Sequence, residues 1–490
     1  MPQQQQQGQD QDQNLADRIM ERLGVSPDVV HRHLRSEAGF EVSCLFLTSI
    51  ADQKLVDETI IRPILHAARM PAADSASFEP FSWLTATIFH GQMKEKDGLE
   101  ACIGAILDGH CLIILPGKQQ ALAMDVCKRE QRSVEEPATE STIRGPREGF
   151  VEDLIRNLSL VRKRVKSDKL VFESMVIGSE TKTMVCLAYM RGIAATELVD
   201  EFRRRLQAID TDSILESAYI EEWIQDKTLT PFPQLIATER PDAIAAKLLE
   251  GQVAVITDGT PIALAGPTTF FQSFAAPEDY YQRADVATLL RWLRMAAFLL
   301  AIFVPALYIS IVSFHPELLP PLLLANLAAQ REGVPFPAFI EATLMMVTFE
   351  VLREAGLRMP RIAGQTISIV GALVLGQAAV EAGIVSAAMV IVVSITAISN
   401  FVSPTYSFGI AQRIVQFFFM TLAGVLGLFG LMCGVFFLMI HLASLRSFGV
   451  RYFAPFAPVI LSDWKDTFVR APRKMLKRRP KLFQPEKSGR

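Results

Sequence analysis

A long apolar stretch constrains this chain more than any other feature of its sequence. Residues 295–445 are apolar with few charges, whereas residues 1–290 carry most of the charge in the manner of a globular protein. A helix needs about 20 consecutive apolar residues to cross a bilayer, because its backbone polar groups can then bond only to one another. A chain of 490 residues also exceeds one compact domain. We therefore expect a helical membrane bundle preceded by a cytoplasmic α/β (α+β) region.

Four segments are free of formal charge for long enough to span a membrane, which predicts a bundle of about four transmembrane helices. They are residues 295–313, 362–380, 382–412 and 414–445. Within the third, a helix is expected over about 386–401, followed by a turn at Ser403-Pro404-Thr405. A fifth segment, 336–352, holds Glu341 and Glu350 on opposite helical faces. It is either an interfacial or extracellular helix, or a helix packed inside the bundle, where charge usually marks function.

Charge at the two ends of the chain predicts the topology. The tail 465–490 has ten Lys or Arg against two acids, which places it in the cytoplasm. The N-terminal residues 1–14 are rich in Gln and Asp and lack the apolar region of a signal peptide, so we expect a disordered leader and a cytoplasmic N-terminal half. Four spans satisfy both placements, and they put Arg353, Arg358 and Arg361 outside or in a re-entrant element.

The segment 362–380 carries two stripes at helical spacing. The first is mostly small, as in closely packed membrane helices: Gly364, Ser368, Gly371, Leu375, Ala378 and Ala382. The second is apolar with one polar end: Ala363, Ile367, Val370, Val374, Gln377 and Glu381. Around an axis of several copies, the second stripe would form a hydrophobic gate with an acidic mouth, with Glu341 nearby. Ordinary bundle packing explains the same pattern and stays open.

The N-terminal half shows alternating helix and strand patterns and an internal repeat. Helices are expected over 15–37, 53–69, 147–166, 195–208 and 241–249, a strand over 41–50, and a hairpin over 172–189. Asp108-Gly109 and Asp258-Gly259 each predict a further hairpin turn. The segments leading to these two turns match at an offset of 150, which predicts two related subdomains.

These patterns divide the chain into five parts. They are the leader 1–14, a first α/β subdomain 15–135, a second 136–276 that includes a linker and a basic helix, a transmembrane domain 277–446, and a basic tail 447–490.

The chain lacks the motifs of the common enzyme classes. It has no phosphate-binding GxxxxGK[ST], no dinucleotide fingerprint, no HExxH and no GxSxG, so we expect no enzyme, no catalytic residue and no cofactor. His31 and His33 form the one close histidine pair, and without further ligands we expect no metal. A net charge of −3 without a basic stripe argues against nucleic acid. Six cysteines without a CxxC pair indicate buried thiols in a reducing compartment.

One arginine-rich turn has two interpretations. Arg144-Gly-Pro-Arg147-Glu148 could bind an anion at a helix N-terminus. We favour the alternative, a helix start that docks one subdomain on another.

Several segments together resemble the A subunits of the GerA-type spore germinant receptors. They are Glu140-Ser-Thr-Ile-Arg144-Gly145-Pro146-Arg147-Glu148-Gly149-Phe150, Asn157, Arg162-Lys163-Arg164, Thr238-Glu239-Arg240-Pro241-Asp242, Leu248-Leu249-Glu250-Gly251, Asp258-Gly259-Thr260-Pro261, Pro277-Glu278-Asp279-Tyr280-Tyr281 and Arg353-Glu354-Ala355-Gly356. The resemblance spans roughly residues 38–485 and looks closer to nutrient receptors than to the SpoVA-operon paralogue.

The resemblance implies an oligomeric channel, a homopentamer, in the inner membrane of a bacterial spore. It would release monovalent cations when a nutrient is sensed, alongside a transporter-like B subunit and a lipoprotein C subunit. A non-conducting scaffold that transmits a signal to these partners is the alternative. A secondary transporter is disfavoured, because the membrane half shows no internal symmetry.

Overall fold

The computed structural model divides the chain into two compact units. It describes residues 15–24, 26–37, 41–67, 80–88, 91, 93–128, 137, 140, 142, 144–358 and 376–483. The α/β unit comprises residues 1–225, 237–267 and 477–490, and the helical unit comprises 226–236 and 268–476.

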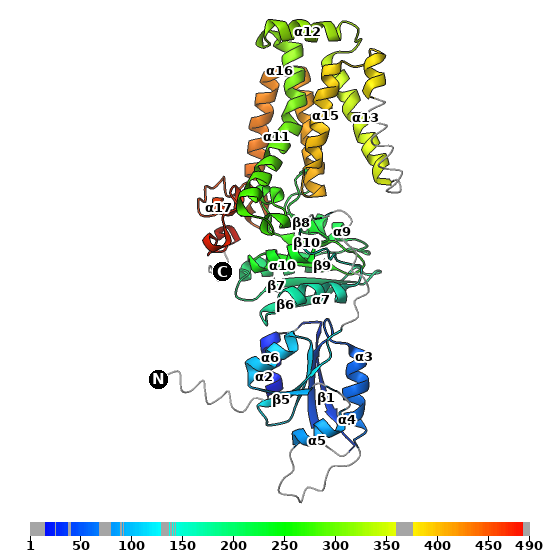
Figure 1. Cartoon of the computed structure of the whole chain (residues 1–490), viewed down its shortest axis with the longest axis vertical. Helices are drawn as coiled ribbons and strands as arrows, with labels where there is room; N and C mark the ends of the chain where they lie inside the picture. The colour runs from blue at the N-terminus through cyan, green and yellow to red at the C-terminus, as the bar shows by residue number, and fades with distance from the viewer. Residues whose placement is uncertain are drawn as a thin grey trace, which may run out of the picture. The chain divides into compact units, whose positions relative to one another are not determined.

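The first half of the α/β unit is a five-stranded antiparallel sheet with helices on both faces (Figure 1). Its strands β1 (Val29–Arg35), β2 (Glu41–Leu47), β3 (Met93–Asp97), β4 (His110–Ile114) and β5 (Gln120–Asp125) lie in the order β1-β2-β4-β5-β3. Along β2, Leu45 and Leu47 pack under α2 (Leu15–Leu23) and α6 (Leu99–Leu107). The alternate residues Cys44 and Phe46 pack under α3 (Gln53–Val56), α4 (Arg62–Leu65) and α5 (Pro80–Thr87). Two-residue alternation on a strand places these sets on opposite faces.

The second half repeats this sheet topology. Its strands β6 (Leu170–Ile177), β7 (Thr183–Met190), β8 (Ile236–Thr238), β9 (Val253–Thr257) and β10 (Ala263–Gly266) lie in the order β6-β7-β9-β10-β8. The order is that of the first sheet with five added to each strand number. Helices α7 (Leu154–Arg164) and α10 (Pro241–Leu249) share a hydrophobic core with this sheet, and α8 (Thr196–Gln207) and α9 (Ser217–Ile224) complete the half.

The structure corrects the register of the sequence repeat. Asp108-Gly109 is not a hairpin, because Asp108 ends helix α6 and Gly109 takes a left-handed φ of +88° before β4. Its structural equivalent is Glu250-Gly251, where Gly251 has φ +95° between α10 and β9. The true offset is therefore 142 residues, from Asp108 to Glu250. The hairpin predicted at Asp258-Gly259 is confirmed, since it joins the antiparallel strands β9 and β10.

Helix boundaries differ from the sequence prediction where glycine or a β-branched run intervenes. The helix expected over 15–37 ends at Leu23, because Gly24 takes a left-handed φ of +75°, and residues 29–35 form β1 instead. The helix expected over 147–166 begins only at Leu154, since Asp153 is its N-cap.

A buried ion pair joins the two halves of the α/β unit. Asp28 precedes β1, and Arg162 lies on α7; both side chains are essentially inaccessible. The Nε and Nη2 atoms of Arg162 donate to the two Asp28 carboxylate oxygens at 2.9 and 3.0 Å, and Ser26 and Ser49 also donate to this carboxylate. Burial alone would raise the pKa of Asp28, but Arg162 and the two hydroxyls hold it below its ordinary value.

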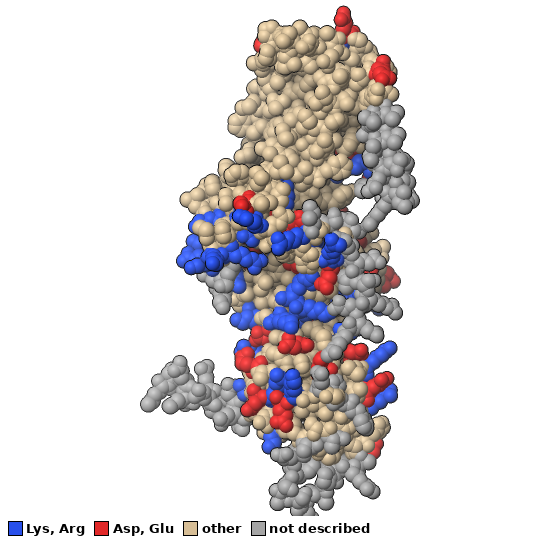
Figure 2. Space-filling model, viewed as in Figure 1, with Lys and Arg blue, Asp and Glu red and all other residues tan. Residues whose placement is uncertain are grey.

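The helical unit contains α11 (Ala284–Phe314), α12 (Pro321–Arg331), α13 (Ala338–Arg358), α15 (Ala387–Phe401) and α16 (Tyr406–Ser444). In the described residues, α11 and α16 are long and apolar enough to cross a membrane, with mean hydropathy of 2.5 and 2.4. However, α16 is not one continuous helix: its backbone leaves helical geometry at Gly427, and the Phe418 and Phe437 rings on either side of this kink lie 5.7 Å apart, so its two parts pack side by side. The helix predicted near 386–401 is confirmed as α15, which at 15 residues is shorter than α11 and α16. Most of the predicted span 362–380 lies outside the described residues, so four spans stay a prediction. Figure 2 shows that the face of these helices in view is almost uncharged.

We predict that Asp28→Asn destabilises the α/β unit. The substitution leaves the Arg162 guanidinium buried without a counterion, and breaking a buried pair in this way costs roughly 3–5 kcal/mol. Chemical denaturation of the full chain in detergent, followed by limited proteolysis of the α/β unit, measures the change. Asp17→Asn on the exposed face of α2 is the control and should shift the midpoint little. Equal midpoints for the two variants would contradict the proposed role of the pair.

Candidate functional site

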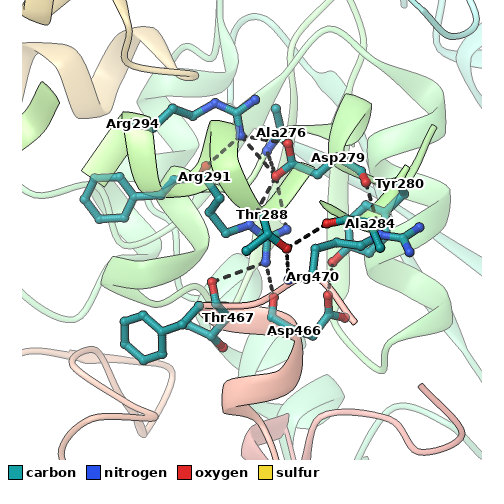
Figure 3. A network of polar contacts seen from close by, with 12 residues as sticks. Ala276, Asp279, Tyr280, Ala284, Thr288, Arg291, Arg294, Asp466, Thr467 and Arg470 are labelled. Carbon is teal, nitrogen blue, oxygen red and sulfur yellow. Dashed lines mark hydrogen bonds and ion pairs between the residues drawn. The ribbon is translucent and has the colours of Figure 1, made fainter. Parts of the chain in front are cut away.

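The best-defined polar network of the helical unit surrounds Asp279, close before the start of α11, the first long apolar helix. Asp279 lies in a short 3-10 helix, η3 (Pro277–Tyr280), and its side chain is fully buried. Arg291 donates to Asp279 Oδ2 from Nε at 3.2 Å and from Nη2 at 3.0 Å. Arg294, one turn further along α11, donates to both carboxylate oxygens at 2.8 and 3.0 Å (Figure 3). One carboxylate therefore fixes the first turns of α11 through bonds to two charged groups.

The chain after α16 returns to the same network. Arg470 Nε donates to the Asp279 carbonyl at 3.1 Å, and its amide donates to Thr288 Oγ1 at 3.1 Å. Arg291 Nη1 donates to the carbonyl oxygens of Asp466 and Thr467, while Tyr280 donates to Asp466 Oδ1 at 3.0 Å. Figure 3 shows these groups converging from η3, α11 and the tail. The network is a joint that couples the start of α11 to the segment following α16.

Beside this joint lies a cluster of aromatic rings. Phe270 contacts Phe274, Phe298 and Phe408, with ring centroids 5.3, 5.5 and 5.7 Å apart. Phe298 lies on α11 and Phe408 on α16, so the cluster packs the two membrane helices against the segment before η3. Aromatic pairs of this geometry each contribute about 0.5–1.5 kcal/mol beyond their buried area.

Glu341 is buried inside the helical unit. Its side chain is fully buried on α13, and Oε1 accepts hydrogen bonds from the amide of Ser386 at 2.5 Å and its hydroxyl at 2.6 Å. Ser386 is the N-cap of α15, and its hydroxyl also accepts from Met389 N at 3.2 Å. A carboxylate at a helix N-terminus is favoured by the helix dipole. Arg331 Nε lies 3.9 Å from Glu341 Oε2, so Glu341 links α12, α13 and α15.

A second polar group crosses from α13 to α16; the sequence patterns indicate Glu350 and Arg353 but not their partner Arg413. Arg413 Nη1 lies 3.4 Å from Glu350 Oε2, and Arg353 also donates to that carboxylate. Nearby on α15 and α16, buried amides form a chain in which Gln412 donates to Asn400 at 2.8 Å and Asn400 donates to Gln416 at 3.2 Å. The four-residue spacing of Gln412 and Gln416 within an apolar run was the available signal. Amide hydrogen bonds of this kind hold membrane helices together.

The predicted constriction residues lie outside the described part of the chain, whereas the predicted mouth residues are described. Ile367, Val370 and Val374 lie outside it, as do the packing residues Gly364, Ser368 and Gly371. At the described end of that segment, residues 376–381 are helical and Ala378 is exposed. Gln377 and Glu381 are exposed too, and Gln377 Nε2 donates to Glu381 Oε1 at 3.0 Å. The polar end of the second stripe is therefore accessible on this chain.

The motif around residue 240 is a buried structural network in the α/β unit. Arg240 is 1% exposed and pairs with Asp242 at 2.8 Å. Its guanidinium also donates to the carbonyls of Glu140 and Pro146 and to Thr142 Oγ1. Residues of two motifs that lie about 100 positions apart thus meet in one network. Burial, only partly offset by Thr238 and Arg240, raises the pKa of Glu140 to about 7.

The anion site considered at Arg144 and Arg147 does not lie at a helix N-terminus. Helix α7 begins at Leu154, where Asp153 accepts from Arg156 N at 2.9 Å and Asp258 accepts from Leu154 N at 3.1 Å. Two carboxylates therefore already satisfy this helix end. The ring centroids of His31 and His33 lie 4.2 Å apart. Across the described residues, no three His, Cys, Asp or Glu side chains are grouped to hold a metal.

The chain is similar to known spore germination proteins over nearly its whole length. The family model described as Bacillus/Clostridium GerA spore germination protein matches residues 17–482. Spore germination protein KA of Bacillus subtilis (strain 168) is 41% identical over 475 residues, covering 96% of this chain and 86% of that protein. The uncharacterized membrane protein YfkQ of the same organism is 42% identical over 456 residues, covering 93% of this chain and 88% of that protein.

Part of the chain is also similar to a solved structure. It is the crystal structure of the N-terminal domain of the A subunit of the Bacillus megaterium spore germinant receptor GerK3. The identity is 31%, the TM-score is 0.40, and the match covers 52% of this chain and 94% of that one.

We predict that Asp279→Asn loosens the joint at α11. The asparagine keeps the shape but removes the counterion of the buried Arg291 and the partly buried Arg294, and breaking a buried pair in this way costs roughly 3–5 kcal/mol. Thermal unfolding of the full chain in detergent should show a lower midpoint. Asp285→Asn is the matched control, since that carboxylate is exposed and lies beside Arg283, which is exposed too. A midpoint unchanged from that of the control would argue against the joint.

We predict a pH-dependent gain from Glu140→Gln. Folding raises the Glu140 pKa to about 7, so the folded state holds a proton that the unfolded chain releases near pH 4. The contribution of protonated Glu140 to stability is therefore fully present below the pKa that this group has in the unfolded chain. It is lost as pH rises through the folded-state pKa of about 7. The stability of the variant minus that of wild type should therefore be larger at pH 8 than at pH 5. Unfolding midpoints of both proteins, measured at both pH values, give this difference. A difference independent of pH would contradict this assignment.

Proposed function

The chain belongs to the GerA family of spore germination proteins, as a germinant receptor A subunit, and from that premise we propose that it forms an oligomeric, nutrient-gated cation channel. The proposed pore is lined by the segment 362–380, with Ile367, Val370 and Val374 as the constriction and Gln377 and Glu381 as the polar mouth.

The observation that carries the proposal is the exposure of Gln377 and Glu381. A charged carboxylate facing hydrocarbon is costly, so an exposed glutamate beside an apolar segment requires water or a partner. The mouth of a pore between neighbouring copies supplies that water. An acidic ring there favours cations by Coulomb attraction.

Glu341 has a supporting part in this proposal. Because its carboxylate bonds to the N-cap of α15, it positions α15 against α12 and α13 and does not itself line the described surface. The Glu350–Arg413 pair and the amide chain through Asn400 would hold α13, α15 and α16 together during opening.

The proposal extends to assembly and location. The subunit would act as a homopentamer in the spore inner membrane, with both termini on the core side and with B and C subunits as partners. Two apolar helices and similarity to a protein named as a membrane protein support membrane insertion. The nutrient would open the channel through the partner that binds it.

A non-conducting scaffold is the competing function. It is favoured by the size of the α/β unit, which contains two complete sheets and is large for a bare channel. In this alternative the joint at Asp279 transmits a signal without an ion path. The two functions differ in flux, because a scaffold passes no ions in any state.

Cation flux through the purified protein in liposomes tests the proposal. Val374→Ala should widen and wet the constriction and raise basal flux by about tenfold, while Glu381→Gln should reduce cation preference. Glu332→Gln, which removes an exposed carboxylate at the end of α12, is the control and should behave as wild type. Oligomers that stay silent in every variant, alone and with B and C subunits, would favour the scaffold.

A further inference from the structure

The segment after α16 lies beside the first turns of α11. The apolar span of α11 begins after Arg291 and Arg294, whose charges are held in the Asp279 network. Trp292 lies at this boundary, the position where tryptophan is enriched in membrane proteins. Its indole donates to the Phe468 carbonyl at 2.8 Å. Because Arg470 also bonds to Thr288 on α11, residues 468–470 lie beside the first turns of this helix.

This segment exposes apolar side chains. Val459 and Leu461 are 64% and 69% exposed, and Phe456, Val469 and Met475 are exposed too. On α11, Leu289, Trp292 and Leu293 follow helical spacing on one face and are also exposed. Exposed apolar groups on neighbouring elements form a surface that water does not favour.

Basic side chains accompany these apolar groups. Between α16 and residue 476 the chain holds six Lys or Arg and two acids, and both acids belong to the local hydrogen-bond structure. Arg451, Lys465, Arg473 and Lys474 are exposed. In the described part of the chain, none of these four side chains forms an ion pair. Figure 2 shows Lys and Arg gathered around α17 (Trp464–Thr467), next to the uncharged helices.

We propose that residues 446–476 bind anionic phospholipid headgroups at the cytoplasmic face of the membrane. Val459, Leu461 and Val469 enter the interfacial layer, while Lys465, Arg473 and Lys474 contact lipid phosphates. Apolar burial and attraction to anionic lipid together are what hold an element at such an interface. The Asp279 joint holds the segment against α11, so lipid contacts made here act directly on the first turns of a membrane helix.

A fluorophore on Leu461→Cys tests this in the full chain reconstituted in nanodiscs. Cys433 is exposed and Cys127 partly exposed, while the other four cysteines are buried, so Cys433→Ser and Cys127→Ser leave one accessible thiol. Nitroxide-labelled phosphatidylcholine quenches the probe where it meets lipid, and iodide quenches it where it meets water. Discs of phosphatidylcholine alone are compared with discs that also contain phosphatidylglycerol.

We expect stronger nitroxide quenching in the discs with phosphatidylglycerol. Lys465→Gln/Arg473→Gln/Lys474→Gln should reduce that quenching about twofold and raise iodide quenching, and high salt should do the same because it screens exposed charges. The control removes three exposed lysines of the α/β unit, Lys118→Gln/Lys128→Gln/Lys182→Gln, and should change neither signal.

Two results would overturn the proposal. A probe shielded from both nitroxide lipid and iodide would show that protein covers this surface, as in an interface with another subunit. Nitroxide quenching of equal strength with and without phosphatidylglycerol, at low and high salt, and in wild type and the triple variant would show apolar insertion without recognition of the headgroup.

Discussion

The start of α11 depends on the buried carboxylate of Asp279. Asp279 accepts bonds from Arg291 and Arg294 on α11, and its backbone holds Arg470 from the tail. Charged groups this close to hydrocarbon are tolerated only when they are paired, so without Asp279 the two arginines could not stay buried at the start of α11. The aromatic cluster around Phe270 packs beside the Asp279 network.

In the α/β unit, buried arginine–carboxylate pairs likewise join segments that are far apart in the sequence. Its two sheets have one strand order, and Arg162 on α7 reaches Asp28 before β1 to join them. Arg240 likewise gathers the chain around Glu140 onto the second sheet. Arginine suits these positions because its planar, permanently charged group can satisfy several acceptors at once. Several residues that carry the family resemblance are thus structural: Arg162, Arg240, Asp242, Asp258 and Asp279.

Sequence patterns predict elements with strong local signals better than they predict which residues pack together. The helix at 241–249 and the turn at Asp258-Gly259 follow from local signals, namely Pro241 at a helix start and Asp-Gly between apolar strands. Asp108-Gly109 carries the same dipeptide but ends a helix, because a left-handed glycine serves both purposes. The repeat was recognised at the wrong offset for this reason. The buried amide chain of Asn400, Gln412 and Gln416 was missed, since uncharged polar residues barely disturb an apolar run.

The sequence by itself determined the kind of protein. Apolar runs must be helical in lipid, and charge excluded from residues 295–445 must gather elsewhere, so a membrane half and an α/β half follow from solvation alone. Only the tertiary structure decided which charges are buried together. Asp28 and Arg162 are 134 residues apart, and Asp279 and Arg470 are 191 apart. Pairing over such distances depends on how elements pack, which no local periodicity records.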